Sequence, residues 1–277
     1  MIKEKTFDTG EVPINYAEGP NNGPPLLLLH GGSWRWQSFT PILPWLTQRW
    51  HIYAPDTRGH GKSGRVPNRY KLRDLAGDTI AFVRNNIEEP CVVFGHSQGG
   101  WQALLLAGEL KDRVRAVILG DTPIYPDELK SRYGRIADWM EQWDPFLETG
   151  MPVAEIAKRY MDGPVTASTR NRARWISQLS RGMVDDYIRQ GRDGSYFFEW
   201  FEGYDPDSLL ISLGVPVLLL QADPECGGMM TDRDVDKAMK FVRDISVARL
   251  RGVNHGLYFD KLEPVLLPLL DFLESLR

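Results

Sequence analysis

Short, wholly apolar runs alternate with amphipathic segments along most of the chain. Apolar runs of this length are typical of strands buried on both faces of a sheet, and the amphipathic segments have helical spacing. We predict strands at residues 26–30, 51–56, 91–96, 114–121, 215–223 and 247–252. We predict helices at residues 43–49, 72–85, 99–111, 232–242 and 261–276. Such alternation favours an α/β fold with a mostly parallel, doubly wound sheet.

Two parts of the chain depart from this alternation. Residues 3–18 have the pattern of two short extended segments that meet near Gly10. Between Asp121 and Val215, more than ninety residues are mostly helical in pattern and rich in aromatic side chains. A connection that long, with helices of its own, indicates an insertion. We therefore predict a core of residues 1–122 and 210–277, and a helical cap at residues 123–209.

Composition narrows the class of protein. The 277 residues are 42% hydrophobic and 25% charged, which is ordinary for a soluble globular protein. The net charge of −4 gives no basic footprint for nucleic acid. No apolar run approaches the ~20 residues of a membrane span, and the first residues lack the apolar core of a signal peptide. Cys91 and Cys226 fall at opposite edges of the predicted sheet, so we expect free thiols and a cytoplasmic protein. A monomer or homodimer is the default expectation.

A glycine-rich turn follows the predicted strand at 91–96. The sequence Gly-His-Ser-Gln-Gly-Gly stands between this strand and a helix, which is the context of a nucleophile elbow. Such a turn holds its serine in an unusual backbone conformation that only very small neighbours tolerate, and Gly95 and Gly99 meet that need. We predict Ser97 to be a nucleophile; the alternative is an ordinary turn.

Four motifs in the chain resemble those of the α/β-hydrolase family, in the same order and at similar spacings. They are LLLLHGGSW at 26–34, APDTRGHGKSG at 54–64, GHSQGG at 95–100 and VNHGLYFDK at 253–261. The resemblance covers nearly the whole chain. It implies an α/β-hydrolase fold, a helical cap after the sixth strand and a catalytic histidine in the last motif.

A serine hydroxyl needs an adjacent base to act as a nucleophile near neutral pH. Of the five histidines, His255 follows the last predicted strand and therefore lies on the same edge of the sheet as Ser97. We predict that His255 takes the proton from Ser97 and later returns it to the leaving group. The alternative is a surface histidine in a turn.

Attack on a carbonyl creates an oxyanion that needs hydrogen-bond donors. The family resemblance and the expected geometry agree on two backbone N–H donors, that of Gln98, just after the nucleophile, and that of Gly32, just after His30 and Gly31. Glycine at 31 and 32 would equally suit a plain tight turn. Trp34 and Trp36 follow directly, and each either lines the acyl pocket or anchors the loop. We assign Trp34 and, among the aromatics of the predicted cap, Trp143 to substrate binding; most other cap aromatics we expect to serve packing.

The acid that would orient His255 has three candidates. The family usually carries it after the seventh strand in a Gly-x-x-Asp context, but this chain has Ala222 for the glycine and Glu225 for the aspartate. Asp223 is the nearest aspartate. A second family arrangement puts the acid after the sixth strand, where Asp121 lies, although Asp121 could also only cap the start of the insertion. We place Asp121 first because the seventh-strand loop is altered, Asp223 as the alternate, and Glu225 third.

Two further site types are not predicted. The loop at 56–63, DTRGHGKS, lacks the spacing of a phosphate-binding P-loop, so we expect a structural role for it. The histidines do not pair at metal-ligand spacing and the cysteines are isolated, so we expect no metal and no cofactor.

Together these features predict a Ser–His–Asp hydrolase that cleaves a small-molecule carboxylic ester or lactone through an acyl-enzyme. Alternatives with the same triad are a C–C bond hydrolase, an amide hydrolase and a cofactor-free haloperoxidase. Dehalogenase and epoxide hydrolase chemistry is disfavoured, because those relatives use an aspartate where Ser97 stands. An alternative from another class is a ligand receptor that keeps the pocket but barely turns over. A nucleic-acid or membrane module is the least favoured.

Overall fold

The computed structural model describes residues 1–160, 167–259 and 261–277. Within them, eight strands form one sheet in the order β1-β2-β4-β3-β5-β6-β7-β8. The strands are β1 (Lys3–Asp8), β2 (Pro13–Glu18), β3 (Pro25–Leu29), β4 (His51–Pro55), β5 (Cys91–His96), β6 (Val114–Gly120), β7 (Val217–Ala222) and β8 (Ile245–Leu250). The six strands from β3 to β8 pair in parallel, whereas β1 and β2 join antiparallel at one edge. The predicted mostly parallel sheet is confirmed, with boundaries shifted by at most a few residues.

The helices fall into two groups along the chain. Those between or after the strands of the sheet are α1 (Leu43–Leu46), α2 (Leu72–Asn86), α3 (Gln98–Glu109), α10 (Asp232–Phe241) and α11 (Leu262–Ser275). Those between β6 and β7 are α4 (Lys130–Glu141), α5 (Val153–Tyr160), α6 (Ala167–Ile176), α7 (Arg181–Arg192), α8 (Gly194–Trp200) and α9 (Pro206–Ser212). None of the described helices is long and apolar enough to cross a membrane.

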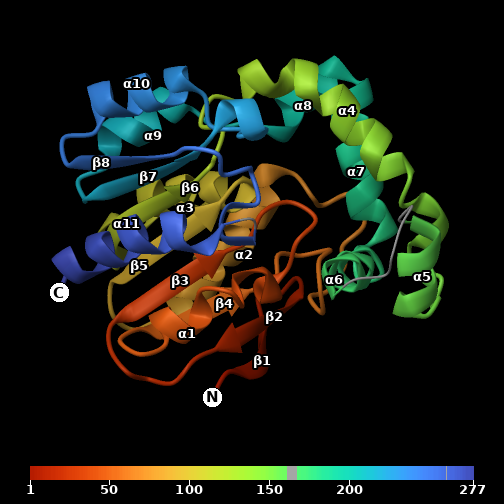
Figure 1. Cartoon of the computed structure of the whole chain (residues 1–277), viewed down its shortest axis with the longest axis horizontal. Helices are drawn as coiled ribbons and strands as arrows, with labels where there is room; N and C mark the ends of the chain where they lie inside the picture. The colour runs from red at the N-terminus through yellow and green to blue at the C-terminus, as the bar shows by residue number, and fades with distance from the viewer. Residues whose placement is uncertain (161–166, 260) are drawn as a thin grey trace.

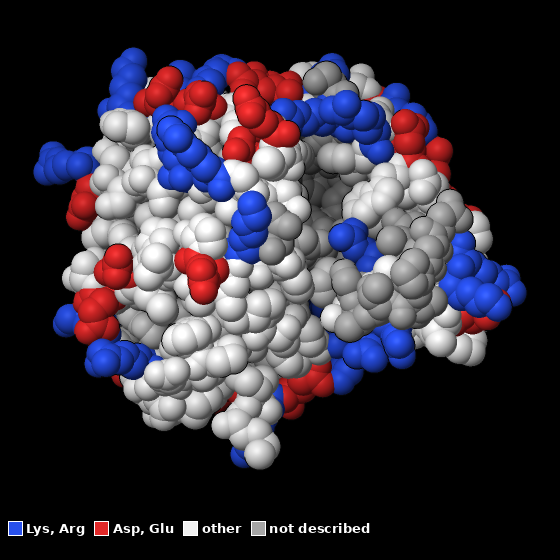
Figure 2. All heavy atoms as spheres, in the orientation of Figure 1, with Lys and Arg blue, Asp and Glu red and all other residues white. Residues whose placement is uncertain are grey.

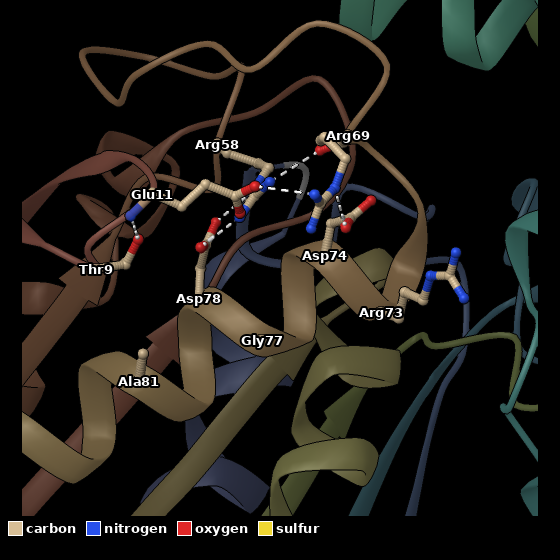
Figure 3. Close-up of a pocket in the computed structure, with 9 residues that line it drawn as sticks. All are labelled: Thr9, Glu11, Arg58, Arg69, Arg73, Asp74, Gly77, Asp78 and Ala81. Carbon is tan, nitrogen blue, oxygen red and sulfur yellow. Dashed lines mark hydrogen bonds and ion pairs between the residues drawn. The ribbon is translucent and has the colours of Figure 1, made fainter.

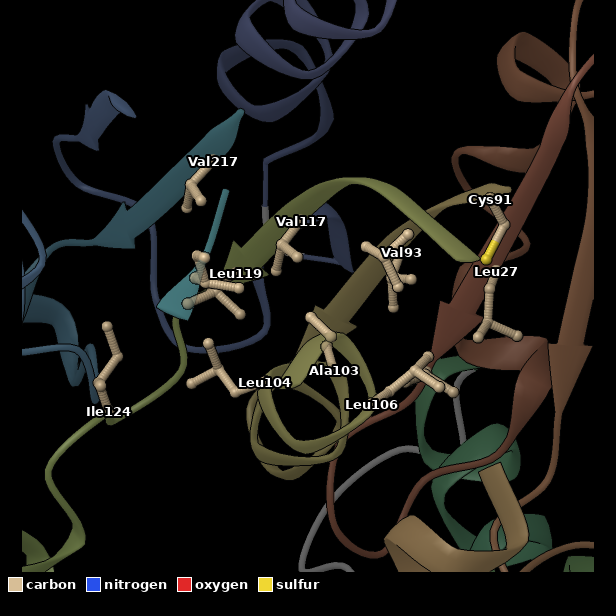
Figure 4. Close-up of a cluster of buried hydrophobic side chains, with 14 of the residues drawn as sticks. Leu27, Cys91, Val93, Ala103, Leu104, Leu106, Val117, Leu119, Ile124 and Val217 are labelled. Atoms are coloured by element: carbon tan, nitrogen blue, oxygen red, sulfur yellow. The ribbon is translucent and has the colours of Figure 1, made fainter. Parts of the chain in front are cut away.

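The sheet is covered on both faces because its strand residues point alternately to either side. In β3, Leu27 and Leu29 face the layer that contains α2, α3 and α10, whereas Leu26 and Leu28 face α1 and α11. Figure 4 shows the first layer, in which side chains of α3 such as Leu104 point toward the strands. Two buried apolar layers of this kind explain why β3 has no polar position.

The helices between β6 and β7 form their own apolar cluster. Figure 1 shows α4 to α8 along the top and right of the molecule, apart from the sheet and the helices that cover it. Their buried aromatic side chains include Trp143, Phe197 and Trp200. Trp101 of α3 joins the cluster, with its ring 4.8 Å from that of Phe201. The boundary predicted between 209 and 210 falls inside α9, which packs against α3 and α10. The division into core and cap stays a prediction.

The loop after β4 is anchored by buried charges. The Arg58 side chain is buried and donates to both carboxylate oxygens of Asp78 at 2.6 Å and to Glu11 at 2.8 Å. Figure 3 shows these groups lining a surface pocket, where Arg69 also faces Asp74 at 2.9 Å. The buried pair of Arg58 with Asp78 ties the loop to α2, and the pair with the more exposed Glu11 ties it to the β1–β2 turn. The arrangement supports the structural role expected for residues 56–63.

Candidate active site

Ser97 occupies the sharp turn between β5 and α3. Its backbone has φ 52° and ψ −120°, outside the regions that most residues adopt. The turn requires glycine on both sides because the backbones approach closely. A Cβ on Gly95 would lie 2.3 Å from the carbonyl oxygen of Gly99, and one on Gly99 would lie 2.1 Å from that of Leu29. The structure therefore has the strained strand–turn–helix that the sequence pattern predicts.

Three side chains from distant segments meet at this turn. His255 Nε2 is 3.0 Å from Ser97 Oγ, and His255 Nδ1 is 2.6 Å from Asp121 Oδ2. Because a carboxylate only accepts hydrogen bonds, Nδ1–H donates to Asp121 and Nε2 is left to accept from the serine hydroxyl. The His255 side chain is 30% exposed, whereas that of Asp121 is fully buried. The hydrogen-bonded chain thus runs from a buried carboxylate to a serine that is partly exposed.

The surroundings of Asp121 favour its ionised form. Its Oδ1 accepts backbone N–H groups of Ala222 and Met230, both at 3.1 Å, and its Oδ2 accepts that of Met229 at 2.8 Å. Burial opposes ionisation, but the hydrogen bond and charge of His255 and these backbone donors outweigh it and lower the Asp121 pKa. An ionised carboxylate at this position can fix the tautomer of His255.

The two other candidate acids lie elsewhere. The Asp223 carboxylate accepts the backbone N–H of Gly252 at 2.7 Å and that of Glu225 at 3.0 Å, and these bonds lower its pKa. The Glu225 side chain is exposed on the short turn after β7. Of the three candidates, Asp121 is the one whose carboxylate contacts His255. Its catalytic role stays a prediction.

Backbone strain concentrates in the segments that meet here. A positive φ occurs at non-glycine residues in four of them: Ser33 (63°), Ser97 (52°), Asp121 (43°) and Leu257 (50°). Each such conformation costs on the order of 1 kcal/mol and persists only where its surroundings enforce it. Strain in several converging loops is typical of a functional site.

The loop after β3 lies directly against the elbow. A Cβ on Gly31 would lie 3.3 Å from Ser97 Cβ, and one on Gly32 would lie 2.7 Å from Oε1 of the Gln98 side chain. Gln98 is the first residue of α3, so its backbone N–H has no acceptor within the helix. The structure therefore brings the Gly32 loop and the start of α3 together beside Ser97. Their role as oxyanion donors stays a prediction.

Three buried histidines hold the loops of the site. His60 Nε2 accepts the backbone N–H of Ser33 at 3.1 Å, and His30 Nε2 accepts the backbone N–H of Thr57 at 2.9 Å. His96 Nε2 donates to the carbonyl oxygen of His255 at 2.8 Å. Burial lowers the pKa of His30 to about 4, and those of His60 and His96 to about 3. All three are therefore neutral near pH 7 and act as fixed hydrogen-bonding partners.

The predicted substrate-binding tryptophans differ in their surroundings. The Trp34 ring stacks on that of His96 at 4.5 Å and lies 5.3 Å from the ring of Phe259. Trp36 anchors its loop, since its Nε1 donates to Glu4 at 2.8 Å. Trp143 is fully buried in the cluster of the β6–β7 helices. Substrate contact stays a prediction for Trp34, which borders the site, and for Trp143, whose described surroundings are those of a packing residue.

Tyr187 lies at the site although no sequence motif marks it. Tyr187 of α7 reaches the Gln98 side chain with its hydroxyl.

Figure 2 shows a hollow in the surface between the side formed by the sheet and its helices and the side formed by α4 to α7. Within the described parts of the chain, no three His, Cys, Asp or Glu side chains converge as metal ligands would.

Comparison with known proteins places this geometry in a family. Residues 26–266 match the family described as "Alpha/beta hydrolase family". A non-heme haloperoxidase of Rhodococcus erythropolis is 26% identical over 92% of this chain and 93% of its own length. A 2-(acetamidomethylene)succinate hydrolase of Mesorhizobium japonicum is 30% identical over 44% of this chain and 43% of its own.

The solved structures extend the likeness of the fold. The crystal structure of a bromoperoxidase from Bacillus anthracis aligns with a TM-score of 0.76, covering 98% of this chain and all of that one, at 18% sequence identity. At that identity the match supports the fold alone. The predicted fold class is confirmed, and the chain belongs to the α/β-hydrolase family.

Proposed function

We propose that this protein is a serine hydrolase that cleaves a carboxylic ester or lactone through an acyl-enzyme. The observation that carries the proposal is the hydrogen-bonded chain from Ser97 through His255 to Asp121, at 3.0 and 2.6 Å. A nucleophile, a base and a group that orients the base are the parts that acyl transfer needs.

Each step follows from the position of these groups. His255 Nε2 takes the Ser97 proton as Oγ attacks the carbonyl carbon, and the backbone N–H groups of Gly32 and Gln98 stabilise the oxyanion that forms. The resulting imidazolium is stabilised by ionised Asp121 and gives its proton to the leaving alkoxide. Water then attacks the acyl-enzyme with His255 again acting as base, which releases the acid and restores Ser97.

Aromatic side chains beside the site support an apolar acyl group. The rings of Trp34, Trp175 and Phe259 lie within 5.3 to 5.9 Å of one another, and Trp34 also stacks on His96 next to the elbow. Clustered aromatic rings of this kind provide the apolar walls that are typical of small-molecule sites.

The test is steady-state hydrolysis of p-nitrophenyl esters of increasing acyl length by wild type and by Ser97→Ala. We expect turnover in the wild type and a loss of at least about 10³-fold in kcat for the variant, because the nucleophile is removed. The profile with acyl length would then size the pocket. Equal rates in both proteins, or a single burst without turnover, would contradict the proposal.

A second candidate is halide oxidation without a metal cofactor, which the similarity to the non-heme haloperoxidase favours. The same acyl-enzyme can be attacked by hydrogen peroxide in place of water, which yields a peracid able to oxidise bromide. Adding peroxide, bromide and a dye that is brominated to the ester assay tests this. Acylation releases p-nitrophenol whether water or peroxide attacks next. Ser97-dependent bromination that takes up most of the acyl groups, with little carboxylic acid formed by direct hydrolysis, would therefore make the second candidate the better one.

A further inference from the structure

Tyr187 reaches the proposed oxyanion hole from outside the sheet. It lies on α7, one of the helices between β6 and β7, and its side chain is buried. Its hydroxyl donates a hydrogen bond to Oε1 of Gln98 and lies 3.5 Å from Nε2 of His60. His60 in turn accepts the N–H of Ser33, which follows Gly32 in the chain. One hydroxyl therefore contacts groups on both sides of the proposed oxyanion hole.

The contact with the Gly32 loop is close. A Cβ on Gly32 would lie 2.7 Å from Gln98 Oε1 and 2.9 Å from the Tyr187 hydroxyl. The carboxamide and the hydroxyl thus both pack against the backbone of Gly32. Because the backbone N–H groups of Gly32 and Gln98 are the two proposed oxyanion donors, a shift of this packing can move the Gly32 donor relative to the Gln98 donor.

The Gln98 carboxamide depends on Tyr187 for its position. A hydroxyl that donates to Oε1 fixes that atom as the acceptor, which leaves Nε2 as the donor end. Nε2 is buried and has no hydrogen-bond partner within the described residues. The bond from Tyr187 is therefore the one side-chain hydrogen bond that the described structure gives this carboxamide. Loss of that bond would leave both ends of a buried amide unpaired, and such a group tends to move.

We propose that Tyr187 is a positioning residue that holds the Gln98 and Gly32 donors in register from α7. The inference rests on the proposed function, since it concerns the oxyanion hole of that reaction. Tyr187 touches no reacting atom; it acts through the Gln98 side chain and the Gly32 backbone. It links the position of α7 to the oxyanion hole, whereas Ser97, Asp121 and His255 lie in the segments that follow β5, β6 and β8.

The first test is Tyr187→Phe, which keeps the ring and removes the hydroxyl. Oxyanion donors act mainly in the transition state, so we expect kcat for p-nitrophenyl esters to fall about 10- to 100-fold while KM changes less than about threefold. Thermal unfolding of both proteins shows whether the variant is folded. A variant that is folded and has wild-type kcat would overturn the inference.

Tyr196→Phe is the matched control. The Tyr196 hydroxyl is also buried and donates to Asp186, the neighbour of Tyr187 on α7, so its loss loosens the same helix without touching the oxyanion loop. We expect kcat to stay within about twofold of wild type, because the oxyanion donors keep their partners. An equal fall of kcat in both variants would assign the effect to general packing of α7 and overturn the inference.

A double-mutant cycle with Gln98→Met tests the route of the effect. Methionine is close to glutamine in size but has no carboxamide, so the Tyr187 hydroxyl loses its target. We expect Tyr187→Phe to have little further effect on kcat in that background, a non-additivity that identifies coupled residues. Additive losses would overturn the inference. A wild type without Ser97-dependent turnover would instead overturn the proposed function and, with it, this inference.

Discussion

The ends of β6 and β7 are neighbours in the sheet, and each is followed by an aspartate in a different environment. Asp121 follows β6 with a positive φ of 43°, and its carboxylate is fully buried beside His255. Asp223 follows β7 with a φ of −70°, and its carboxylate is partly exposed and caps its own turn. The same residue type at adjacent strand ends therefore meets two different sets of partners.

The difference lies in the direction of the backbone donors. In the segment after β7, the N–H groups of Met229 and Met230 donate to the Asp121 carboxylate, whereas that of Glu225 donates to the Asp223 carboxylate. The altered seventh-strand loop thus serves the carboxylate of the neighbouring strand. A loop that departs from the family pattern therefore supplies backbone donors to the acid that we assign to the triad.

Replacing Asp121 by Asn gives the largest expected effect on this comparison. An amide of the same shape can present its NH₂ to His255 and select the wrong tautomer, so we expect kcat for esters to fall about 10³- to 10⁴-fold. Steady-state kinetics beside wild type measures the loss, and circular dichroism checks that the variant is folded. Full turnover by Asp121→Asn would show that another group orients His255 and remove the basis of the comparison.

The pH dependence of the free energy of unfolding tests the buried surroundings of the site, as opposed to the exposed turn after β7. The pKa values of His30, His60 and His96 are lowered by burial to about 4, 3 and 3, below the ~6.5 of an unfolded chain. Between these values the unfolded state binds more protons, so the stability that these groups contribute above pH 6.5 is lost as the pH falls toward 4. Each contributes at most ~1.4 kcal/mol per pH unit.

Denaturant unfolding at pH 7.0 and 5.0 measures this loss, with His60→Gln as the informative variant. Glutamine can donate and accept as His60 does but does not titrate, so we expect a smaller fall in stability between the two pH values than in wild type. Burial also raises the Asp234 pKa to about 6, which acts in the opposite sense; the difference between the two proteins isolates the histidine. An equal fall in stability in both proteins would show that His60 does not cause the loss.

Most of the sheet could be predicted from the sequence because the signal is local. The run Leu26 to Leu29 is apolar at every position since both faces of β3 are covered, and the Gly95 and Gly99 pattern predicts a turn that the close backbone approach requires. These predictions depend on neighbours in the chain. The structure confirms the strands, while the catalytic roles stay predictions.

The acid and Tyr187 could not be predicted in the same way because both depend on contacts between distant segments. Whether Asp121 or Asp223 faces His255 is decided by how the β7 segment folds back, and the sequence ranked the two without deciding between them. Tyr187 lies among many aromatic residues in a helical segment, and nothing in its neighbourhood distinguishes it from a packing residue. Its contact with Gln98 spans 89 positions of the chain.

Replacing Asp223 by Asn has the smallest expected effect, and it tests the aspartate after β7 as Asp121→Asn tests the one after β6. The amide oxygen can still accept from Gly252 and Glu225, so we expect kcat within about twofold of wild type and a thermal midpoint lowered by no more than about 3 °C. Glu225→Gln, on the same exposed turn, is the control and should match wild type in both. A loss of kcat in Asp223→Asn alone as large as that expected for Asp121→Asn would move the triad acid to β7, because the amide oxygen still accepts from both Gly252 and Glu225.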